Sequence, residues 1–238
     1  LAILGSGDAG GEAALIAAKS GLKVALIESQ KWGGSSLNYT NVPLGALFHA
    51  TQLFRAATEG AKFGLSSASL RYNYPTLNNW KNVAMKRAHA NSKKDFEEAG
   101  IDCIHGLGRL LSAHEISVGE QKTIKAKNIL LATGASMLDT GITIPEDFDF
   151  WLPENVLEMI RPPKTIFIVG AGPTGCELAQ FFATLGTEVI IADIAGRLLP
   201  REDEEVGQVL DDVFNKQGIK VLTQSRVIAL EHDSIAKK

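Results

Sequence analysis

Short apolar runs in this chain alternate with longer segments in which small and apolar residues recur at helical spacing. Residues 1–4 and 23–28 predict buried strands, and the alanine-rich segment 10–20 between them predicts a helix that packs closely on a sheet. The same order of strand, helix and strand returns at 165–169, 174–185 and 188–193. Strands that alternate with helices in this way favour parallel sheets. The pattern therefore predicts two α/β units in one chain.

Further elements are predicted around these two units. A linker rich in proline at 145–163 suggests a division into domains 1–150 and 151–238. We expect both domains to be doubly wound and Rossmann-like, with a small β-meander within roughly residues 101–126 of the first. Helices are predicted at 43–63, 76–99 and 204–217, and strands at 101–105, 115–118, 127–132, 220–222 and 227–230.

Composition narrows the class of protein. The length of 238 residues exceeds the usual size of one domain, and 45% hydrophobic with 21% charged residues is typical of a globular protein. The net charge of -3 argues against a nucleic-acid partner. No apolar run approaches the ~18 residues of a membrane span. Cys103 and Cys176 have no C-x-x-C or metal-ligand partner, which predicts a reducing, cytoplasmic setting and no metal site.

Two glycine fingerprints carry the candidate chemistry, Gly5-Ser6-Gly7-Asp8-Ala9-Gly10 and Gly170-Ala171-Gly172-Pro173-Thr174-Gly175. In a strand–loop–helix, the first glycine permits the tight turn, the second lets the backbone approach a pyrophosphate, and the third lets helix and strand pack closely. The phosphates then lie at the positive end of the helix dipole. One such fingerprint is weak, because glycine loops serve many turns. Two copies in matching context predict two dinucleotide sites.

An acidic residue follows each fingerprint at the same distance. Glu28 lies 23 positions after Gly5, and Asp193 lies 23 positions after Gly170. A carboxylate at this point accepts hydrogen bonds from ribose hydroxyls and repels a 2′-phosphate, so Asp193 predicts NAD(H) rather than NADP(H). Arg197 is close enough in sequence to soften that preference.

One segment between the fingerprints reads Gly33-Gly34-Ser35-Ser36-Leu37-Asn38-Tyr39-Thr40-Asn41-Val42-Pro43. It resembles the active-site segment of the pyridine nucleotide-disulfide oxidoreductases, which reads G-G-T-C-L-N-x-G-C-I-P-S-K. Ala132-Thr133-Gly134 and the stretch 197–203 resemble further motifs of this family, most closely those of its dihydrolipoamide dehydrogenase and mercuric reductase members. The resemblance covers nearly the whole chain. It implies FAD at the first fingerprint, a nicotinamide cofactor at the second, and a homodimeric parent protein.

The resemblance also implies which residues contact the cofactors. On the FAD side the implied residues are Gly5, Gly7, Gly10, Glu28, Gly34, Ser35, Gly108, Thr133 and Gly134. On the nicotinamide side they are Gly170, Gly172, Gly175, Glu177 and Asp193. The family pattern continues past the last residue, so we expect the second domain to be incomplete here.

The departures from the family pattern decide the expected chemistry. Ser36 and Asn41 stand where the family has its two redox cysteines, and Leu44 and Gly45 replace its serine and lysine. Neither a hydroxyl nor an amide accepts electrons as a disulfide does. We therefore predict no catalytic residue in this segment. Cys176, at the start of a helix in the second domain, is interpreted as a packing residue.

Two hypotheses remain open. The first is an FAD-dependent NAD(P)H oxidoreductase, in which hydride passes from NADH to flavin and electrons continue to a small-molecule acceptor that is not a disulfide. The alternative is a non-catalytic paralogue or fragment that binds FAD or NAD without turnover. Loss of the lysine together with the cysteines favours this alternative more than loss of the cysteines alone.

Overall fold

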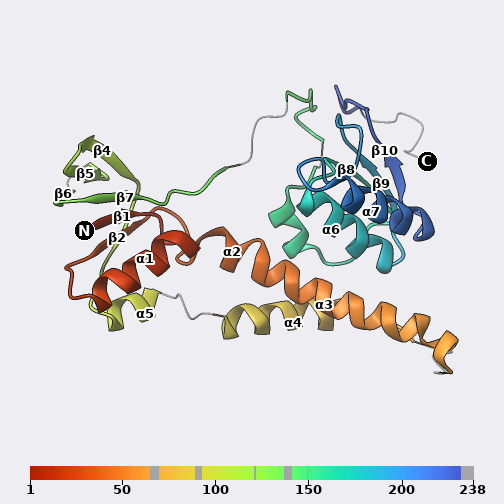
Figure 1. Ribbon diagram of the computed structural model, residues 1–238, viewed down its shortest axis with the longest axis horizontal. Coiled ribbons are helices and arrows are strands. Elements are labelled where there is room, and N and C mark those ends of the chain that lie inside the picture. The colour runs from red at the N-terminus through yellow and green to blue at the C-terminus, as the bar shows by residue number, and fades with distance from the viewer. Residues whose placement is uncertain (65–69, 89–92, 121, 137–140, 149, 232–238) are drawn as a thin grey trace. The chain divides into compact units, whose positions relative to one another are not determined.

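The computed structural model describes residues 1–64, 70–88, 93–120, 122–136, 141–148 and 150–231 (Figure 1). By its internal contacts the chain forms two compact units. The first comprises residues 1–46 and 79–137, and the second comprises residues 47–78 and 138–238. The predicted α/β class, with parallel sheets, is confirmed.

A four-stranded parallel sheet forms the centre of the first unit, with the order β3-β2-β1-β7. Helices α1 and α5 pack on this sheet, and a separate antiparallel meander has the order β4-β5-β6. The strands are β1 (Ala2–Leu4), β2 (Ala25–Glu28), β3 (Asp102–His105), β4 (Gly108–Ser112), β5 (Glu115–Val118), β6 (Lys122–Lys125) and β7 (Ile129–Leu131). The helices are α1 (Asp8–Lys19), α2 (Gly34–Asn38) and α5 (Lys93–Glu98).

Successive side chains of β1 and β2 enter two different cores. Ile3 and Leu26 pack with Phe96 of α5, and all three are fully buried. Ile27 turns to the opposite face and packs with Ile116 of the meander. Because both faces of the sheet are covered, the strands consist of apolar runs rather than alternating apolar and polar residues.

The second unit is built on the three-stranded parallel sheet β10-β9-β8. Helix α6 contacts β8 and β9, and α7 contacts β10. The core includes the fully buried rings of Phe181, Phe182 and Phe214. The strands are β8 (Thr165–Val169), β9 (Glu188–Ala192) and β10 (Lys220–Leu222), and the helices are α6 (Pro173–Thr184), α7 (Glu204–Lys216) and the 3₁₀ helix η3 (Pro153–Glu158).

Residues 47–78 group with the second unit through aromatic and hydrogen-bonded contacts. They include most of α3 (Asn41–Thr58), the 3₁₀ helix η1 (Glu59–Phe63) and the start of α4 (Tyr74–Arg87). The ring of Phe48 meets Phe181 edge-on at 5.9 Å, and the hydroxyl of Tyr72 donates a hydrogen bond of 2.9 Å to the carbonyl of Leu185. A linear division of the chain after residue 150 would keep these helices with the first unit. The structure groups them with the second unit, because their contact partners there lie more than 100 positions further along the chain.

Three predicted elements differ from the structure. Residues 101–105 were assigned to the meander, but residues 102–105 form β3 of the parallel sheet, where Ile104 is buried. The single helix predicted at 76–99 is α4 followed by α5, and residues 89–92 lie outside the described part of the chain. The strand predicted at 227–230 is reduced to one bridge between Thr143 and Ala229, because no neighbouring strand continues the pairing among the described residues.

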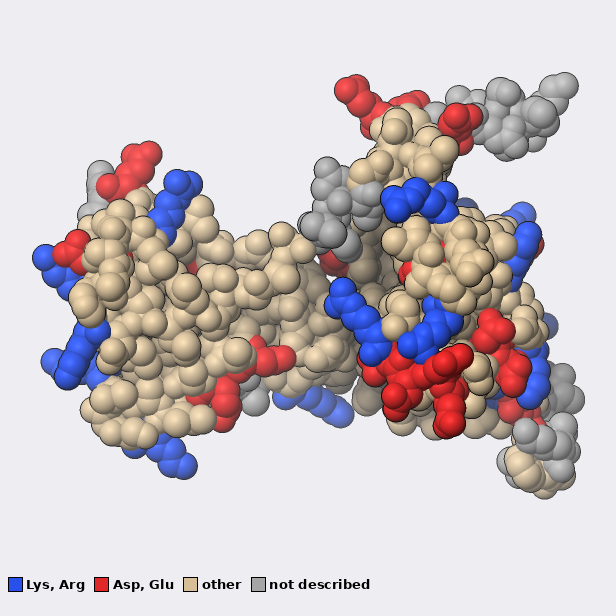
Figure 2. Space-filling model, turned by 45° about the horizontal axis from the view of Figure 1, so that its top comes forward, with Lys and Arg blue, Asp and Glu red and all other residues tan. Residues whose placement is uncertain are grey.

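No helix in the described part of the chain is long and apolar enough to cross a bilayer. On the face shown in Figure 2, lysine and arginine side chains lie interspersed with acidic ones and form no continuous basic patch.

Truncation of a strand leucine tests the assignment of the first core. We expect Leu26→Ala to lower the free energy of unfolding by about 2–5 kcal/mol, because it leaves a cavity in a fully buried site. The matched variant Leu111→Ala removes a side chain that is 59% exposed and is expected to change stability by less than about 0.5 kcal/mol. Urea denaturation measures both, and equal effects would contradict the assignment.

Candidate nucleotide-binding site

The two glycine loops are built in the same way. Adding 165 to a residue number in the first loop gives its structural equivalent in the second. The amide of Gly5 donates to the carbonyl of Ile27 at 2.8 Å, and the amide of Gly170 donates to the carbonyl of Ala192 at 2.8 Å. The strand register repeats with the same offset, with Ala2 opposite Ala25 and Phe167 opposite Ile190.

The first and third glycines of each fingerprint are required by the backbone. Gly5 and Gly170 have φ values of +96° and +106°, in the left-handed region that favours glycine. A Cβ atom on Gly10 would overlap the carbonyl oxygen of Gly5, and a Cβ on Gly175 would overlap that of Gly170. Only glycine, which has no Cβ atom, allows the helix and the loop to approach this closely.

The second glycines face open space instead. A Cβ added to Gly172 would meet nothing within 4 Å, and one added to Gly7 would meet only the Cα of Gly34 at 3.7 Å. These two glycines are the N-caps of α6 and α1, and neither helix start has a side-chain cap. Free amides beside an open approach fit a pyrophosphate group at both loops.

Glu28 ends β2 and binds the first loop through its carboxylate, although only 7% of the residue is exposed. Its Oε2 accepts a hydrogen bond from the Ser6 amide at 2.9 Å and another from the Ser6 hydroxyl at 2.6 Å. Its Oε1 accepts from the amide of Gln30 at 2.8 Å. Three hydrogen bonds therefore fix the carboxylate beside the glycine loop.

Asp193 repeats this arrangement in the second unit. Its Oδ2 accepts from the amide of Ala171 at 2.6 Å, and its Oδ1 accepts from the amide of Ala195 at 2.7 Å. Each carboxylate oxygen has two lone-pair sites, so both oxygens of Asp193 keep one acceptor site for a ribose hydroxyl.

Arg197 is engaged within its own loop. Its Nη2 donates to the carbonyl of Pro200 at 3.1 Å and to that of Glu202 at 2.8 Å. Its Nη1 is buried without a hydrogen-bond partner. The Nη2 group is therefore satisfied within the loop.

The turn after Glu28 brings one further predicted residue, Gly34, to the first loop. Gly34 has φ of +65°, and a Cβ there would lie 2.5 Å from the Cα of Gly7, so the two backbones are in direct contact. The Asn38 side chain donates to the carbonyls of Trp32 at 3.0 Å and Gly34 at 2.8 Å and thereby fixes the turn. Ser35, the next predicted contact, is exposed.

The other predicted FAD contacts have different surroundings. Thr133 follows β7 beside the glycine loop, since a Cβ on Gly5 would lie 3.3 Å from the Thr133 Cα. Gly134 is exposed and has φ of +69°. Packing alone explains the glycine at position 108, because a Cβ there would overlap the Leu4 side chain. Its contact with FAD stays a prediction.

Ser6 was not among the site residues predicted from the sequence. The residue is fully buried, and its hydroxyl joins Glu28 to the turn at Gly33, whose amide donates to Oγ at 3.1 Å. The feature in the sequence that could have indicated Ser6 is a hydroxyl side chain between the first two glycines of the fingerprint.

The segment that departs from the family pattern contains neither a thiol nor a lysine. Ser36 lies in α2 and is half-buried, and Asn41 is the exposed first residue of α3. Leu44 is buried, while Gly45 is exposed with open space around it. No redox-active side chain is therefore present at these positions.

The two cysteines are placed as packing residues. Burial raises the pKa of Cys176 to about 11, and its thiol donates to the carbonyl of Ala171 at 3.4 Å. Burial also raises the pKa of Cys103, with a further contribution from the nearby carboxylate of Glu97. Both thiols are therefore protonated and weakly nucleophilic at neutral pH.

Glu177, the remaining predicted nicotinamide-side residue, lies in the first turns of α6. The residue is exposed, although partial desolvation by neighbouring protein atoms raises its carboxyl pKa above the usual value. Within the described residues no group of three or more His, Cys, Asp or Glu side chains is placed to hold a metal ion.

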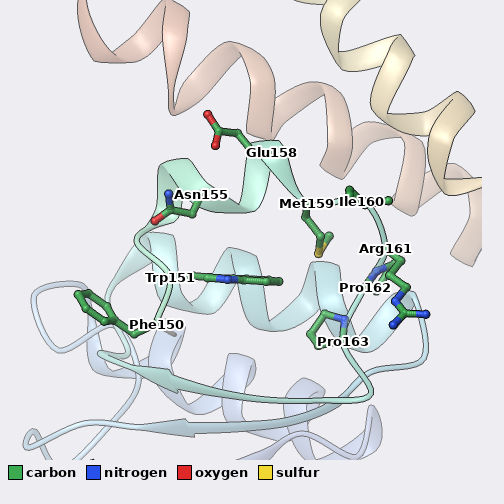
Figure 3. Close-up of a pocket in the computed structure, with 9 residues that line it drawn as sticks. All are labelled: Phe150, Trp151, Asn155, Glu158, Met159, Ile160, Arg161, Pro162 and Pro163. Carbon is green, nitrogen blue, oxygen red and sulfur yellow. The ribbon is translucent and has the colours of Figure 1, made fainter. Parts of the chain in front are cut away.

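A hollow of about 580 Å³ lies in the linker before β8. Figure 3 shows Trp151 at the middle of its lining residues, which come from the segment 150–163. None of these lining residues belongs to a glycine loop.

Comparison with known proteins agrees with this geometry. The model of the pyridine nucleotide-disulphide oxidoreductase family matches residues 1–238, and the chain belongs to that family. Dihydrolipoyl dehydrogenase from Zymomonas mobilis is 31% identical over 98% of this chain and 51% of its own length. The enzyme of that name from Chlamydia pneumoniae is 32% identical over 96% of this chain and 50% of its own length. The chain thus spans about half the length of these relatives.

The fold also matches a solved structure. The flavoprotein disulfide reductase RclA from Escherichia coli, determined as a Cu(II) complex, superposes with a TM-score of 0.80 at 24% identity. The match covers 98% of this chain and 50% of that one.

Two glycines three positions apart in the second loop, Gly172 and Gly175, give contrasting predictions. Gly175→Ala is expected to lower the melting temperature by several degrees, because its Cβ would overlap the Gly170 carbonyl. Gly172→Ala is expected to keep nearly wild-type stability and to weaken NADH binding, because its methyl group would enter the open approach. Thermal unfolding and NADH titration measure the two effects. Equal destabilisation by both variants would show that the loop has a different geometry.

Proposed function

We propose that the protein is an FAD-dependent NAD(H) oxidoreductase whose electrons leave the flavin directly for a small-molecule acceptor. One observation carries the proposal. Two equivalent loop-and-carboxylate sites are intact, while the segment that carries the redox disulfide in the family contains Ser36 and Asn41. Membership in the family supports flavin-dependent redox chemistry in general.

The first unit supplies the residues that would hold FAD. Gly7 leaves room for the pyrophosphate at the start of α1, and Glu28 Oε1, which keeps one acceptor site, would accept a hydrogen bond from the ribose. Gly34 borders the same approach, Thr133 lies beside the loop, and the exposed Ser35 and Gly134 would complete the contacts. When bound, FAD accepts a hydride and releases its electrons singly or in pairs.

The second unit supplies the corresponding residues for a nicotinamide cofactor. Gly172 opens the approach to α6, and both oxygens of Asp193 retain an acceptor site for ribose hydroxyls. Glu177, whose carboxyl is partly desolvated, stands one turn into α6. The carboxylate of Asp193 and the engaged guanidinium of Arg197 support NAD(H) over NADP(H).

Neither cysteine of the chain replaces the missing disulfide. A pair of thiols that stores electrons needs one accessible thiolate to start the exchange. Cys176 is buried and hydrogen-bonded, and the pKa of both cysteines is raised. This supports an acceptor such as a quinone or molecular oxygen. The homodimer implied by the family and the cytoplasmic setting stay predictions.

The second candidate is a protein that binds FAD and NAD(H) without turnover. Gly45 favours it, because no basic side chain occupies the position of the family lysine. A flavin that stays oxidised in the presence of NADH would support this candidate.

Anaerobic addition of NADH to the flavin-loaded protein tests the proposal. We expect the flavin absorption band to bleach and to return on addition of a quinone. A variant without cysteines, Cys103→Ala with Cys176→Ala, is expected to bleach at the same rate, because no thiol carries the electrons. A bound flavin that never bleaches would overturn the proposed activity. Bleaching that requires the cysteines would overturn the direct route to the acceptor.

Replacement of the second ribose carboxylate tests the cofactor preference. Asp193→Ser removes the negative charge that would face a 2′-phosphate and keeps a short polar side chain. We expect the ratio of NADPH to NADH affinity to rise at least about 10-fold, measured by fluorescence titration. Glu202→Gln, which neutralises an exposed carboxylate further along the same loop, serves as the control. An unchanged ratio in the Asp193 variant would refute the assigned role.

A further inference from the structure

Ser6 lies where the two repeated loops differ in chemistry. Its equivalent in the second unit is Ala171, which has no hydroxyl group. Both residues donate their backbone amide to the carboxylate that ends the following strand, Glu28 or Asp193. Ser6 therefore makes contacts beyond those that the shared loop requires.

The hydroxyl of Ser6 joins two segments that are separate in sequence. Its Oγ donates to Glu28 Oε2 at 2.6 Å and accepts from the Gly33 amide at 3.1 Å, and the residue has no exposed surface. Because the hydroxyl proton points to a carboxylate, the oxygen lone pairs are free to accept from Gly33. One buried group thus fixes both the carboxylate and the turn.

The second unit achieves the corresponding connection with its backbone. The amide of Leu199 donates to the carbonyl of Ala171 at 2.9 Å, so the segment after Asp193 docks on the same loop position without a hydroxyl. The equivalent of Gly33 by the 165-residue offset is Leu198, one residue earlier. The hydroxyl contact is accordingly specific to the first unit.

The turn held by Ser6 borders the approach to the first loop. Gly33 and Gly34 have φ values of +89° and +65°, and the backbone of Gly34 touches that of Gly7. A small rotation of this turn would change the space in front of the Gly7 amide. The position of the turn therefore controls the shape of the space in front of the Gly7 amide, where a phosphate would bind.

We propose that Ser6 is a positioning residue for FAD, whose hydroxyl couples the ribose-binding carboxylate of Glu28 to the phosphate-facing turn at Gly33 and Gly34. The inference rests on the proposed FAD site in the first unit. A purely structural role would lower the stability of the protein but leave the affinity of its folded form for FAD unchanged. A positioning role changes that affinity.

Titration of the flavin-free protein with FAD, followed by quenching of flavin fluorescence, tests the inference. We expect Ser6→Ala to bind FAD about 10-fold more weakly, because the charge-assisted hydrogen bond to Glu28 and the hydrogen bond from the Gly33 amide are both lost. Ser6→Cys fills a similar space but hydrogen-bonds weakly, so it tests the same role if the alanine variant does not fold. It is expected to bind FAD several-fold more weakly than the wild type.

Thr51→Ala is the matched control. Thr51 is a buried hydroxyl residue, 3% exposed, whose Oγ1 donates only within its own helix to the carbonyl of Phe48 at 2.9 Å. We expect this variant to keep the wild-type affinity for FAD. Both Ser6 variants are expected to keep the wild-type affinity for NADH within about twofold, because the second loop is unchanged.

The outcomes separate this inference from the proposal on which it rests. Wild-type affinity for FAD in a folded Ser6→Ala or Ser6→Cys protein would overturn the positioning role and leave the FAD site intact. A wild-type protein that binds NADH but no FAD would overturn the FAD site, and the role of Ser6 with it.

Discussion

The hydrogen bonds between a carboxylate at the end of a strand and the backbone amide of a glycine loop hold each candidate site together. In the first unit Glu28 accepts from Ser6, and in the second Asp193 accepts from Ala171. A carboxylate that accepts amide hydrogen bonds needs no positively charged partner nearby. The arrangement fixes the loop, leaves the start of the following helix open, and retains acceptor sites that a ribose can use.

Because the two units share the loop and its carboxylate, one chain provides two similar sites. The residues around the two loops differ. The loop, its left-handed first glycine and the close contact of its third glycine repeat with the same offset. Beyond the loop, the first unit adds the Ser6 hydroxyl and the turn at Gly34, whereas the second adds the Arg197 loop, which is held by its own carbonyls. The shared part suits a pyrophosphate and a ribose, and the added parts give the two sites different surroundings.

The sequence was sufficient for the parts of the structure that depend on local chemistry. The fingerprints, the carboxylates of Glu28 and Asp193 and the parallel strands follow from glycine conformation, helix dipoles and apolar runs. The grouping of residues 47–78 with the second unit was not predictable in this way, because it rests on contacts such as that of Phe48 with Phe181. The role of Ser6 was also missed, since a serine at that position has no distinctive periodicity and its partner Gly33 is 27 positions away. Residues 102–105 were misassigned because a short strand does not show in sequence which sheet it joins.

We infer that one chain holds two different dinucleotides at separate sites. Isothermal titration gives the sharpest test, with FAD added first and NAD⁺, which does not reduce the flavin, added to the FAD-saturated protein. We expect one FAD and one NAD⁺ bound per chain, with NAD⁺ binding retained at saturating FAD. Loss of NAD⁺ binding once FAD is bound would show that the two compounds compete for one site and would contradict this inference.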